Sequence, residues 1–436
     1  MSILRRHAAI AAASLIAAAF LATSAPIRAQ DPPKQVERPK PEETTAGETK
    51  PAEAPTPAPD PASQDPSKSE VFLPSFHGWN ASLVYDNDVG VWMVGCCKVF
   101  PTYGAPEVIG LDDKGRCTIL SVYSGKWTRW DTVGEGKWLG ALTQEEMDPG
   151  LPGPEIYTGG TRGNLYQVYA HGPGVFSTRL IAEVPGKEIN TSVSADFLPG
   201  NPGNELALFT WPGGLLLVGA KEGRFTVEHA GDFPDLVRQA ILLPGRPGEA
   251  PEVAVASRAG RVATILVRDG KPEWNTILQR PMGFGRVALR PGSTPESTVF
   301  YSVCDDGLAF RHERRGGGEW RTEAIYAGPQ GHRGVAAGRF DADPAKETIA
   351  TFGYSGKVQL LTRERDGWKA ETLFVDRDKG HWMQVAELDG RNATDEILCS
   401  GYGKRVVLLS RVPGYGLPGV ATDPVEAEIP HAPDPR

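Results

Sequence analysis

Three histidines occupy positions in this chain from which they could do chemistry. His77, His332 and His381 each adjoin a glycine, and the last two lie fifteen residues before a glutamate. Three imidazoles that converge can hold a divalent transition metal. A single imidazole beside cationic groups can instead act as a general base on an anionic substrate, and His332, His381 and Arg333 are the candidates for such a catalytic role.

Polar and aromatic residues in comparable positions extend this set into a predicted ligand-binding site. Aromatic faces suit the stacking of sugar rings, while arginine can bind anionic groups. A structural interpretation is also open, in which each tryptophan packs against a neighbour and each histidine caps a turn. The predicted ligand-binding residues are His77, Trp79, Lys137, Trp138, Asn190, Arg286, His332, Arg333, His381 and Trp382.

The elements that would position these residues follow from an internal repeat. After each repeated glutamate comes a strand-like run, a turn that usually contains glycine and a second run, which is the pattern of a β-hairpin. An aromatic residue starts a third run 20 to 24 positions after six of the glutamates, and a fourth run precedes the next one. The glutamates recur at intervals of 44 to 51 residues and are Glu107, Glu155, Glu205, Glu252, Glu296, Glu347 and Glu396.

Four strands in a repeat of about 48 residues is the size of a propeller blade. The sequence therefore predicts an all-β fold, a seven-bladed β-propeller of four-stranded blades. The seventh repeat lacks its outer strand, and residues 70–73 are predicted to supply it, so that an N-terminal strand closes the ring.

In a propeller, the loops that lead into the innermost strands gather around the axis at one face, and convergent loops are the usual place for a binding site. The candidate site residues all lie in these predicted loops. Because the first, sixth and seventh blades become neighbours when the ring closes, His77, His332 and His381 are predicted to lie side by side. We therefore expect a ligand site on the axis, with a three-histidine metal site as one form of it.

The first blade is predicted to carry an insertion within residues 86–107, which contains Cys96 and Cys97. Adjacent cysteines can form a strained vicinal disulfide, or one of them could pair with Cys117 on the next hairpin. Five cysteines are an odd number, so at least one thiol stays free or pairs with another molecule.

Two segments resemble known repeats. Residues 338–361, GRFDADPAKETIATFGYSGKVQLL, and residues 386–409, AELDGRNATDEILCSGYGKRVVLL, are similar to FG-GAP or VCBS-type propeller repeats. In that family an aspartate-rich loop often binds Ca²⁺, a cation that takes six to eight oxygen ligands. The resemblance implies Asp341, Asp343 and Glu347 as ligands in the sixth blade. The alternative is that these aspartates form Asx-turns.

The two ends of the chain differ in composition from the repeats. Residues 1–29 contain a basic start, an apolar run and small residues, which predicts a cleaved signal peptide and no transmembrane segment in the mature protein. Residues 30–68 are rich in proline and lack aromatic residues, which predicts a disordered linker. The propeller is expected over residues 69–412 and a proline-rich tail over residues 413–436. The predicted location is periplasmic or extracellular.

The charge pattern narrows the class of function. The net charge is -8 and no lysine or arginine cluster stands out, so nucleic-acid binding is not expected. The favoured hypothesis is an exported propeller that binds a ligand, or a protein or carbohydrate partner, through its axial face. The alternative is a carbohydrate-active enzyme of lyase or dehydratase type with a histidine and arginine site. The cofactor is left open, with a divalent metal, either a transition metal or Ca²⁺, as the candidate.

Overall fold

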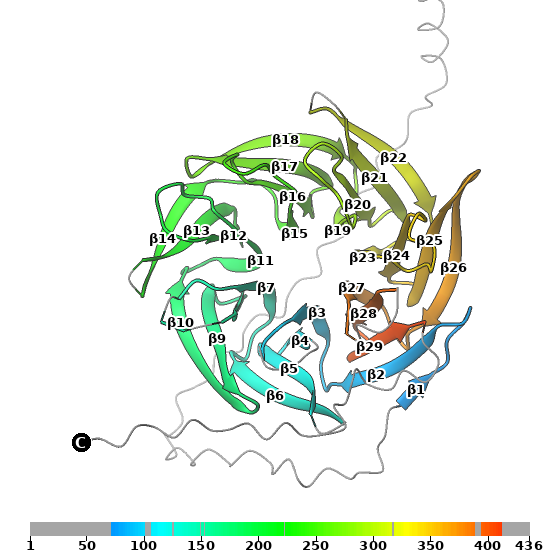
Figure 1. Cartoon of the computed structure of the whole chain (residues 1–436), viewed down its shortest axis with the longest axis horizontal. Helices are drawn as coiled ribbons and strands as arrows, with labels where there is room; N and C mark the ends of the chain where they lie inside the picture. Colours follow the sequence, from blue (N-terminus) through cyan, green and yellow to red (C-terminus); the bar gives the residue numbers. More distant parts are fainter. Residues whose placement is uncertain are drawn as a thin grey trace, which may run out of the picture. The chain divides into compact units, whose positions relative to one another are not determined.

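The computed structural model describes residues 71–411, except for residues 101–105, 124–125, 149, 152, 222, 316–317 and 389–393. The predicted signal peptide, linker and C-terminal tail lie outside the described residues. Within the described part, 29 strands form seven sheets and no helix is present. The sheets follow one another around a closed ring (Figure 1), which confirms the predicted all-β seven-bladed propeller.

Six blades each consist of four consecutive strands, from the axis outwards. Blades one to three contain β3 (Val91–Cys97), β4 (Glu107–Asp112), β5 (Arg116–Tyr123) and β6 (Lys126–Gly134); β7 (Leu139–Glu145), β8 (Glu155–Gly160), β9 (Asn164–Gly172) and β10 (Val175–Glu183); and β11 (Glu188–Ala195), β12 (Glu205–Trp211), β13 (Gly214–Lys221) and β14 (Arg224–Gly231). Blades four to six contain β15 (Val237–Leu242), β16 (Glu252–Ser257), β17 (Arg261–Arg268) and β18 (Lys271–Gln279); β19 (Phe284–Leu289), β20 (Val299–Cys304), β21 (Leu308–Arg314) and β22 (Trp320–Ala327); and β23 (His332–Ala337), β24 (Thr348–Gly353), β25 (Lys357–Glu364) and β26 (Gly367–Val375).

The seventh blade joins the two ends of the described chain. Its sheet runs in the order β27 (Gly380–Ala386), β28 (Glu396–Gly401), β29 (Arg405–Ser410), β2 (Asn80–Asp86) and β1 (Val71–Leu73). The fourth strand is therefore β2, which pairs with β29, while β1 adds a fifth strand at the outer edge. The prediction that residues 70–73 fill the fourth position is wrong by one strand.

Because β2 belongs to blade seven, blade one has no insertion, and that prediction is wrong. The innermost strand of this blade is β3, within the residues that were predicted to be inserted. It begins sixteen residues before its glutamate, as β7 and β27 do in their blades. The apolar residues of β3 are mostly buried, as expected of a strand that packs against neighbours on both faces.

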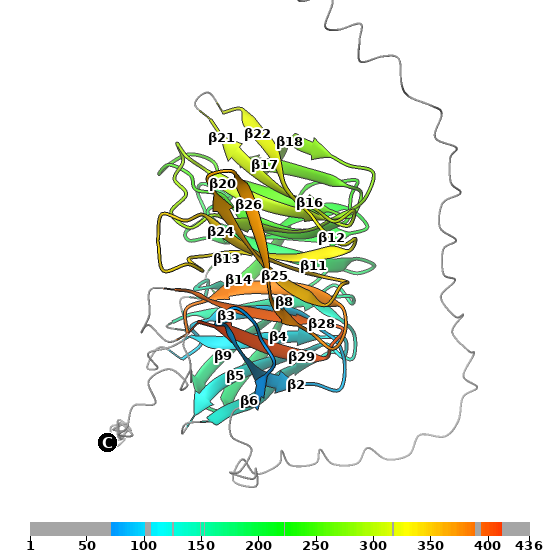
Figure 2. The same ribbon diagram turned by 90° about the vertical axis from the view of Figure 1, so that its right-hand side faces the viewer.

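Burial follows position in the blade. The second strands β4, β8, β24 and β28 are buried at every residue, because blades pack on both of their faces. The outermost strand β14 is largely exposed. Seen from the side, the strands of each blade lie across the thickness of the ring (Figure 2). Aromatic residues near the start of outermost strands pack towards the preceding blade, as Trp368 of β26 does on Tyr301 of β20 with ring centroids 6.3 Å apart.

The repeated glutamates shape the loop that joins the first and second strands of a blade. In blade three, one carboxylate oxygen of Glu205 accepts hydrogen bonds from the backbone N–H groups of Phe197 (2.9 Å) and Leu198 (3.0 Å). Glu107 and Glu155 hold the N–H groups seven and eight residues earlier in the same way, and Glu396 holds the one eight residues earlier. Four of the seven repeated glutamates thus act as a clamp, by which we mean a side chain that accepts the backbone N–H groups of the preceding loop.

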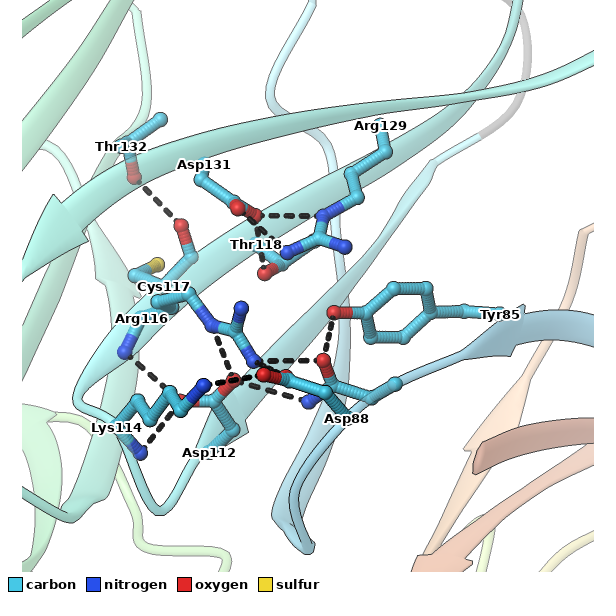
Figure 3. A network of polar contacts seen from close by, with 11 residues as sticks. Tyr85, Asp88, Asp112, Lys114, Arg116, Cys117, Thr118, Arg129, Asp131 and Thr132 are labelled. Atoms are coloured by element: carbon cyan, nitrogen blue, oxygen red, sulfur yellow. Dashed lines mark hydrogen bonds and ion pairs between the residues drawn. The ribbon is translucent and has the colours of Figure 1, made fainter. Parts of the chain in front are cut away.

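Polar contacts connect β2, the strand that closes the ring, and the turn after it to blade one (Figure 3). Arg116 donates to Asp112 at 2.6 Å and to Asn87 at 2.7 Å, and it also pairs with Asp88. Lys114 forms a second ion pair with Asp88. These contacts tie the turn between β2 and β3 to the hairpin of β4 and β5.

All five cysteines are free, so the predicted disulfides are wrong. Cys97 lies opposite Glu107 on β4, while Cys117 lies opposite Leu111 on the other side of that strand. A whole strand therefore separates the two cysteines, which places their Cα atoms beyond the roughly 7 Å that a disulfide spans. Cys96 and Cys97 are successive strand residues whose side chains point to opposite faces.

Candidate axial binding site

Each innermost strand contains a β-bulge near its start. One residue is skipped in the pairing with the second strand of the blade, and two are skipped in blade five. A bulge leaves its extra residue unpaired and re-aims the side chain, and bulges are common beside functional sites. The skipped residues are Trp92, Gly140, Asn190, Arg238, Gly285 with Arg286, Arg333 and His381.

The bulges of six blades meet around one cavity of about 120 Å³ on the axis. This volume suits a small ligand or a single protruding group, because pockets for drug-sized ligands measure roughly 300–1,000 Å³. Three tryptophans form apolar walls, while arginine, asparagine and histidine supply polar atoms. The lining residues are Trp92, Met93, Trp138, Gly140, Asn190, Leu236, Arg238, Arg286, His381 and Trp382.

Three arginines of neighbouring blades make the surroundings of the axial cavity positively charged. Arg238 and Arg333 both pair with Asp305, at 3.1 Å and 3.2 Å. Arg286 has no ion pair with a carboxylate among the described residues, and its guanidinium lies 4.3 Å from the ring centre of Trp382. Burial first, and then the charges of Arg238 and Arg333, lower the pKa of Arg286 well below its ordinary value. Positive charge at this place is therefore energetically costly.

His381 lies in the same cluster as a neutral imidazole. Its Nδ1 atom is 3.2 Å from the carbonyl oxygen of Trp92, and the two rings meet edge to face with centroids 4.5 Å apart. Burial first, and then the charge of Arg286, lower the pKa of His381 well below its ordinary value. An Nδ1–H that donates to Trp92 leaves Nε2 as the basic nitrogen of the ring.

Two of the predicted site residues lie far from the axis. His77 is exposed in the turn between β1 and β2, at the outer edge of blade seven. Trp79 is buried and packs against Phe340 of blade six with ring centroids 6.3 Å apart. Both were candidates because they precede residues 80–86, and the predicted insertion after residue 86 implies that this run is the innermost strand of blade one. The structure places it fourth in the sheet of blade seven. The three histidines therefore do not converge.

His332 also turns away from the axis, for a different reason. In blade six Thr348, not Glu347, takes the clamp position, since its hydroxyl accepts the N–H of Phe340 eight residues earlier at 3.1 Å. Counted from Thr348, the residue equivalent to His381 is Arg333. A one-residue shift along a strand moves a side chain to the other face. His332 is accordingly buried and stacked on Tyr326, where burial lowers its pKa to about 4.

The predicted calcium ligands do not fit a cation. Asp341 and Asp343 accept backbone N–H groups two residues ahead, which makes them Asx-turns. The carboxylate of Glu347 is held by Arg311 at 2.7 Å and by Arg363 at 2.8 Å. Across the described residues, no group of three histidine, cysteine, aspartate or glutamate side chains is placed to hold a metal ion.

Sequence reasoning found half of the cavity lining. Trp138, Asn190, Arg286, His381 and Trp382 line it, whereas Lys137 is exposed in the loop before β7. Trp92, Met93, Gly140, Leu236 and Arg238 were missed. Trp92 and Gly140 share with His381 the position fifteen residues before the clamp glutamate, so the spacing alone could have located them.

A second hollow lies at the other end of the strands. It measures about 390 Å³ and lies between blades four and five, beyond the ends of β15 and β17. Its arginines are largely neutralised, because Arg246 pairs with Glu249 and Glu296, and Arg314 pairs with Glu252. The axial cavity is smaller, but its charge is less completely balanced.

No protein-family model and no curated protein matches this chain. Among solved structures, it is similar to the WD40 β-propeller domain of Doa1, with a TM-score of 0.52 and 14% identity over 76% of this chain and 97% of that one. It is also similar to BBS1N, solved in complex with ARL6DN, with a TM-score of 0.52 and 11% identity over 80% of this chain and 99% of that one. The β-propeller domain of Cps50 (Swd1) from Myceliophteria thermophila gives a TM-score of 0.50 and 10% identity, over 78% and 99%. At such identities the likeness shows the fold alone.

Within residues 71–411, outside the gaps given above, no helix is long and apolar enough to cross a membrane.

Proposed function

We propose that this protein is an exported binding propeller whose axial cavity holds a small ligand or a protruding group of a protein partner. The observation that carries the proposal is the ring of bulges, which brings residues from six blades to one cavity. A bulge re-aims a side chain and is common beside functional sites, so a bulge in the innermost strand of every blade supports a binding site at the axis.

Several further observations support this proposal. BBS1N was solved in complex with ARL6DN, so a chain of similar fold takes a protein partner. Because propellers can be binders or enzymes, the function has to be argued from the site and not from the fold. Export is supported by the basic start, apolar run and small residues of positions 1–29. Descent from FG-GAP or VCBS-type repeats is supported by residues 338–361 and 386–409.

A second candidate function is a lyase acting on an acidic sugar. The observation that favours it is the place of His381, whose Nδ1 lies 3.5 Å from a terminal nitrogen of Arg286 in a buried setting that lowers the pKa of the imidazole. In such an elimination, an arginine would neutralise the carboxylate of the sugar and the imidazole would take the proton beside it. The electrons of the broken C–H bond would form a double bond as the leaving group departs.

The test of the binding function is a screen of the full secreted chain against glycans and extracellular proteins. Trp138→Ala and Asn190→Ala should each weaken a specific partner about 30-fold, since truncating a central contact commonly costs 2 kcal/mol or more. Arg268→Ala, in the hollow at the other end of the strands, should leave binding unchanged. Binding that survives both axial changes and is lost in Arg268→Ala would contradict the proposal.

The lyase is tested on the same preparation with polyuronates. Growth of the ultraviolet absorbance of an unsaturated product, abolished by His381→Ala, would place the enzyme ahead of the binder. If the absorbance does not change over hours at micromolar protein, the lyase function is excluded.

A further inference from the structure

The guanidinium of Arg286 is buried with few of its hydrogen bonds made. The residue is 5% exposed and lines the axial cavity. One terminal nitrogen donates to the carbonyl oxygen of Gly285 at 2.8 Å, and the Nε–H has no acceptor among the described residues. The other terminal nitrogen lies 3.5 Å from Nδ1 of His381, which itself lies 3.2 Å from the Trp92 carbonyl. If that Nδ1 carries the hydrogen, it cannot accept from Arg286.

The neighbouring charges do not compensate for this. Asp305 is the one carboxylate that pairs with Arg238 and Arg333 within the described chain, so three arginines share a single negative charge. A buried ionised group without a counterion costs several kcal/mol, and native proteins pair such groups or bind an ion. Two of the three positive charges in this arginine cluster therefore have no counterion among the described residues.

Arg311 shows what a structural arginine looks like in this fold. It is 6% exposed, about as buried as Arg286. It forms ion pairs with Glu347 at 2.7 Å and with Glu313 at 3.2 Å. The blades thus supply carboxylates to a buried arginine where the fold requires one. Arg286 lacks such a partner, and the cavity stands beside it.

The cavity is also polar on one side and apolar on the other. Arg238 and Arg286 lie on neighbouring blades, and Asn190 of the blade before them adds an amide. Trp92 and Trp138 come from blades one and two. A ligand that accepts hydrogen bonds along one edge and presents a flat face elsewhere would satisfy both sides. A carboxylate on a ring has this form, and arginine forks bind it through two parallel hydrogen bonds.

We propose that the axial cavity binds a carboxylate group carried on a single ring, with Arg286 as its buried counterion and the tryptophans against the ring. This rests on the proposed function, because it specifies the ligand of that same axial cavity. The cavity of about 120 Å³ limits the bound part to one ring with its acid group. Sugar acids and aromatic acids share this chemistry, and the test separates them.

The test uses the full secreted chain and two matched pairs of probes. Galacturonate is compared with galactose and benzoate with benzamide, at equal ionic strength set with sodium chloride, by calorimetric titration and by the thermal midpoint. We expect saturable heats and a raised midpoint for an acid but not for its neutral partner, because a ligand of the folded state alone stabilises it. A stronger effect of galacturonate identifies a sugar-acid site, and a stronger effect of benzoate an aromatic-acid site.

Variants distinguish a ligand counterion from a structural arginine. Arg286→Met should weaken the acid more than tenfold and leave the midpoint of the ligand-free protein unchanged or higher, because it removes a costly charge. Arg311→Met should lower the ligand-free midpoint, because it removes the buried ion pairs with Glu347 and Glu313, and acid binding by the folded protein should persist.

The proposal is overturned if neither acid binds, if the neutral partners bind equally well, or if Arg286→Met lowers the ligand-free midpoint as Arg311→Met does and leaves acid binding intact. These outcomes concern the carboxylate alone. A partner found in the screen above that depends on Trp138 and Asn190 would still support an axial binding function without it.

Discussion

A single carboxylate oxygen that binds two backbone N–H groups recurs from blade to blade. Glu107, Glu155 and Glu205 hold the loop before the second strand in this way. Burial raises the pKa of each, while the N–H groups oppose that shift. In blade six the clamp residue lies one position after the repeated glutamate, and the bulge of the innermost strand lies one position later as well. Thr348 clamps blade six, so Arg333 rather than His332 faces Asp305 and the axis.

The clamp predicts which repeated glutamates matter for stability. Glu205→Ala should lower the free energy of unfolding by about 1–3 kcal/mol, because it leaves one buried and one partly buried N–H group without this acceptor. Glu296→Ala should change it by less than about 0.5 kcal/mol, since that glutamate is exposed and its ion pair is with Arg246, which is exposed as well. Urea unfolding followed by tryptophan fluorescence measures both. Equal losses of unfolding free energy in the two variants would contradict this prediction, because they would show that the backbone hydrogen bonds of Glu205 do not stabilise the fold.

His312 predicts a dependence of stability on pH. It is buried between Ser302 and Thr322, at 2.8 Å and 2.9 Å, and burial lowers its pKa to about 3. The unfolded chain binds a proton there below pH 6.5 and the folded chain does not until about pH 3. Stability is therefore fully present above pH 6.5 and falls as the pH falls through this window.

Replacing this histidine isolates its contribution. His312→Gln keeps a polar side chain that does not titrate, so the variant should lose stability less steeply between pH 5.5 and 4. The difference in slope should be about 1.4 kcal/mol per pH unit, the value for one proton. Urea titrations of both proteins at several pH values give the slopes. Parallel slopes would mean that His312 takes up its proton in the folded protein as well.

At the scale of elements, the ring depends on a strand from the other end of the described chain. The β2 strand covers the edge of β29, and the contacts of Arg116 with Asn87 and Asp88 lock the following turn to blade one. An uncovered edge would expose unpaired backbone groups to other chains. Residues 71–90 are thus part of the fold and not an extension of it.

Truncation tests this closure. A chain that begins at Val71 should fold as the full chain does, because it retains all described strands. A chain that begins at Val91 should aggregate or unfold at a markedly lower temperature, and a synthetic peptide of residues 71–90 added in trans should restore part of the loss. Thermal scans and size-exclusion chromatography report the outcome. A stable, monomeric chain from Val91 would show that the ring closes without β2.

At the scale of the whole molecule, seven sheets are held together without a covalent link. All five cysteines are free, and Cys97, Cys117, Cys304 and Cys399 are buried, where burial raises the pKa of their thiols. The thiolate is the reactive form, so these cysteines are chemically quiet while the ring is closed.

The expected result is a thermal midpoint that reductant does not change. Thiol titration without reductant should find five reactive groups per chain after denaturation and fewer before it. Three groups after denaturation, together with a midpoint that falls when reductant is added, would establish a disulfide instead.

The all-β propeller with seven blades could be predicted from the sequence because its information is local and repeated. Each hairpin is defined by residues within about one blade of each other, and seven copies reinforce the same interpretation. Asn190, Arg286 and Trp382 could be found as site candidates because they lie at the start of predicted innermost strands. Arg238 lay in the same kind of loop and carried no signal of its own.

The tertiary structure alone decided which side chains meet. Whether residues 80–86 or Val91–Cys97 form an innermost strand depends on how the two ends of the ring join, and both runs are apolar enough for either place. A shift of one residue, invisible in a spacing of about 48, separates His332 from Arg333 and changes the face that each presents. Sequence by itself determined the ring; the closure of its ends and the register of each bulge decided that its axis holds arginines and tryptophans rather than three histidines.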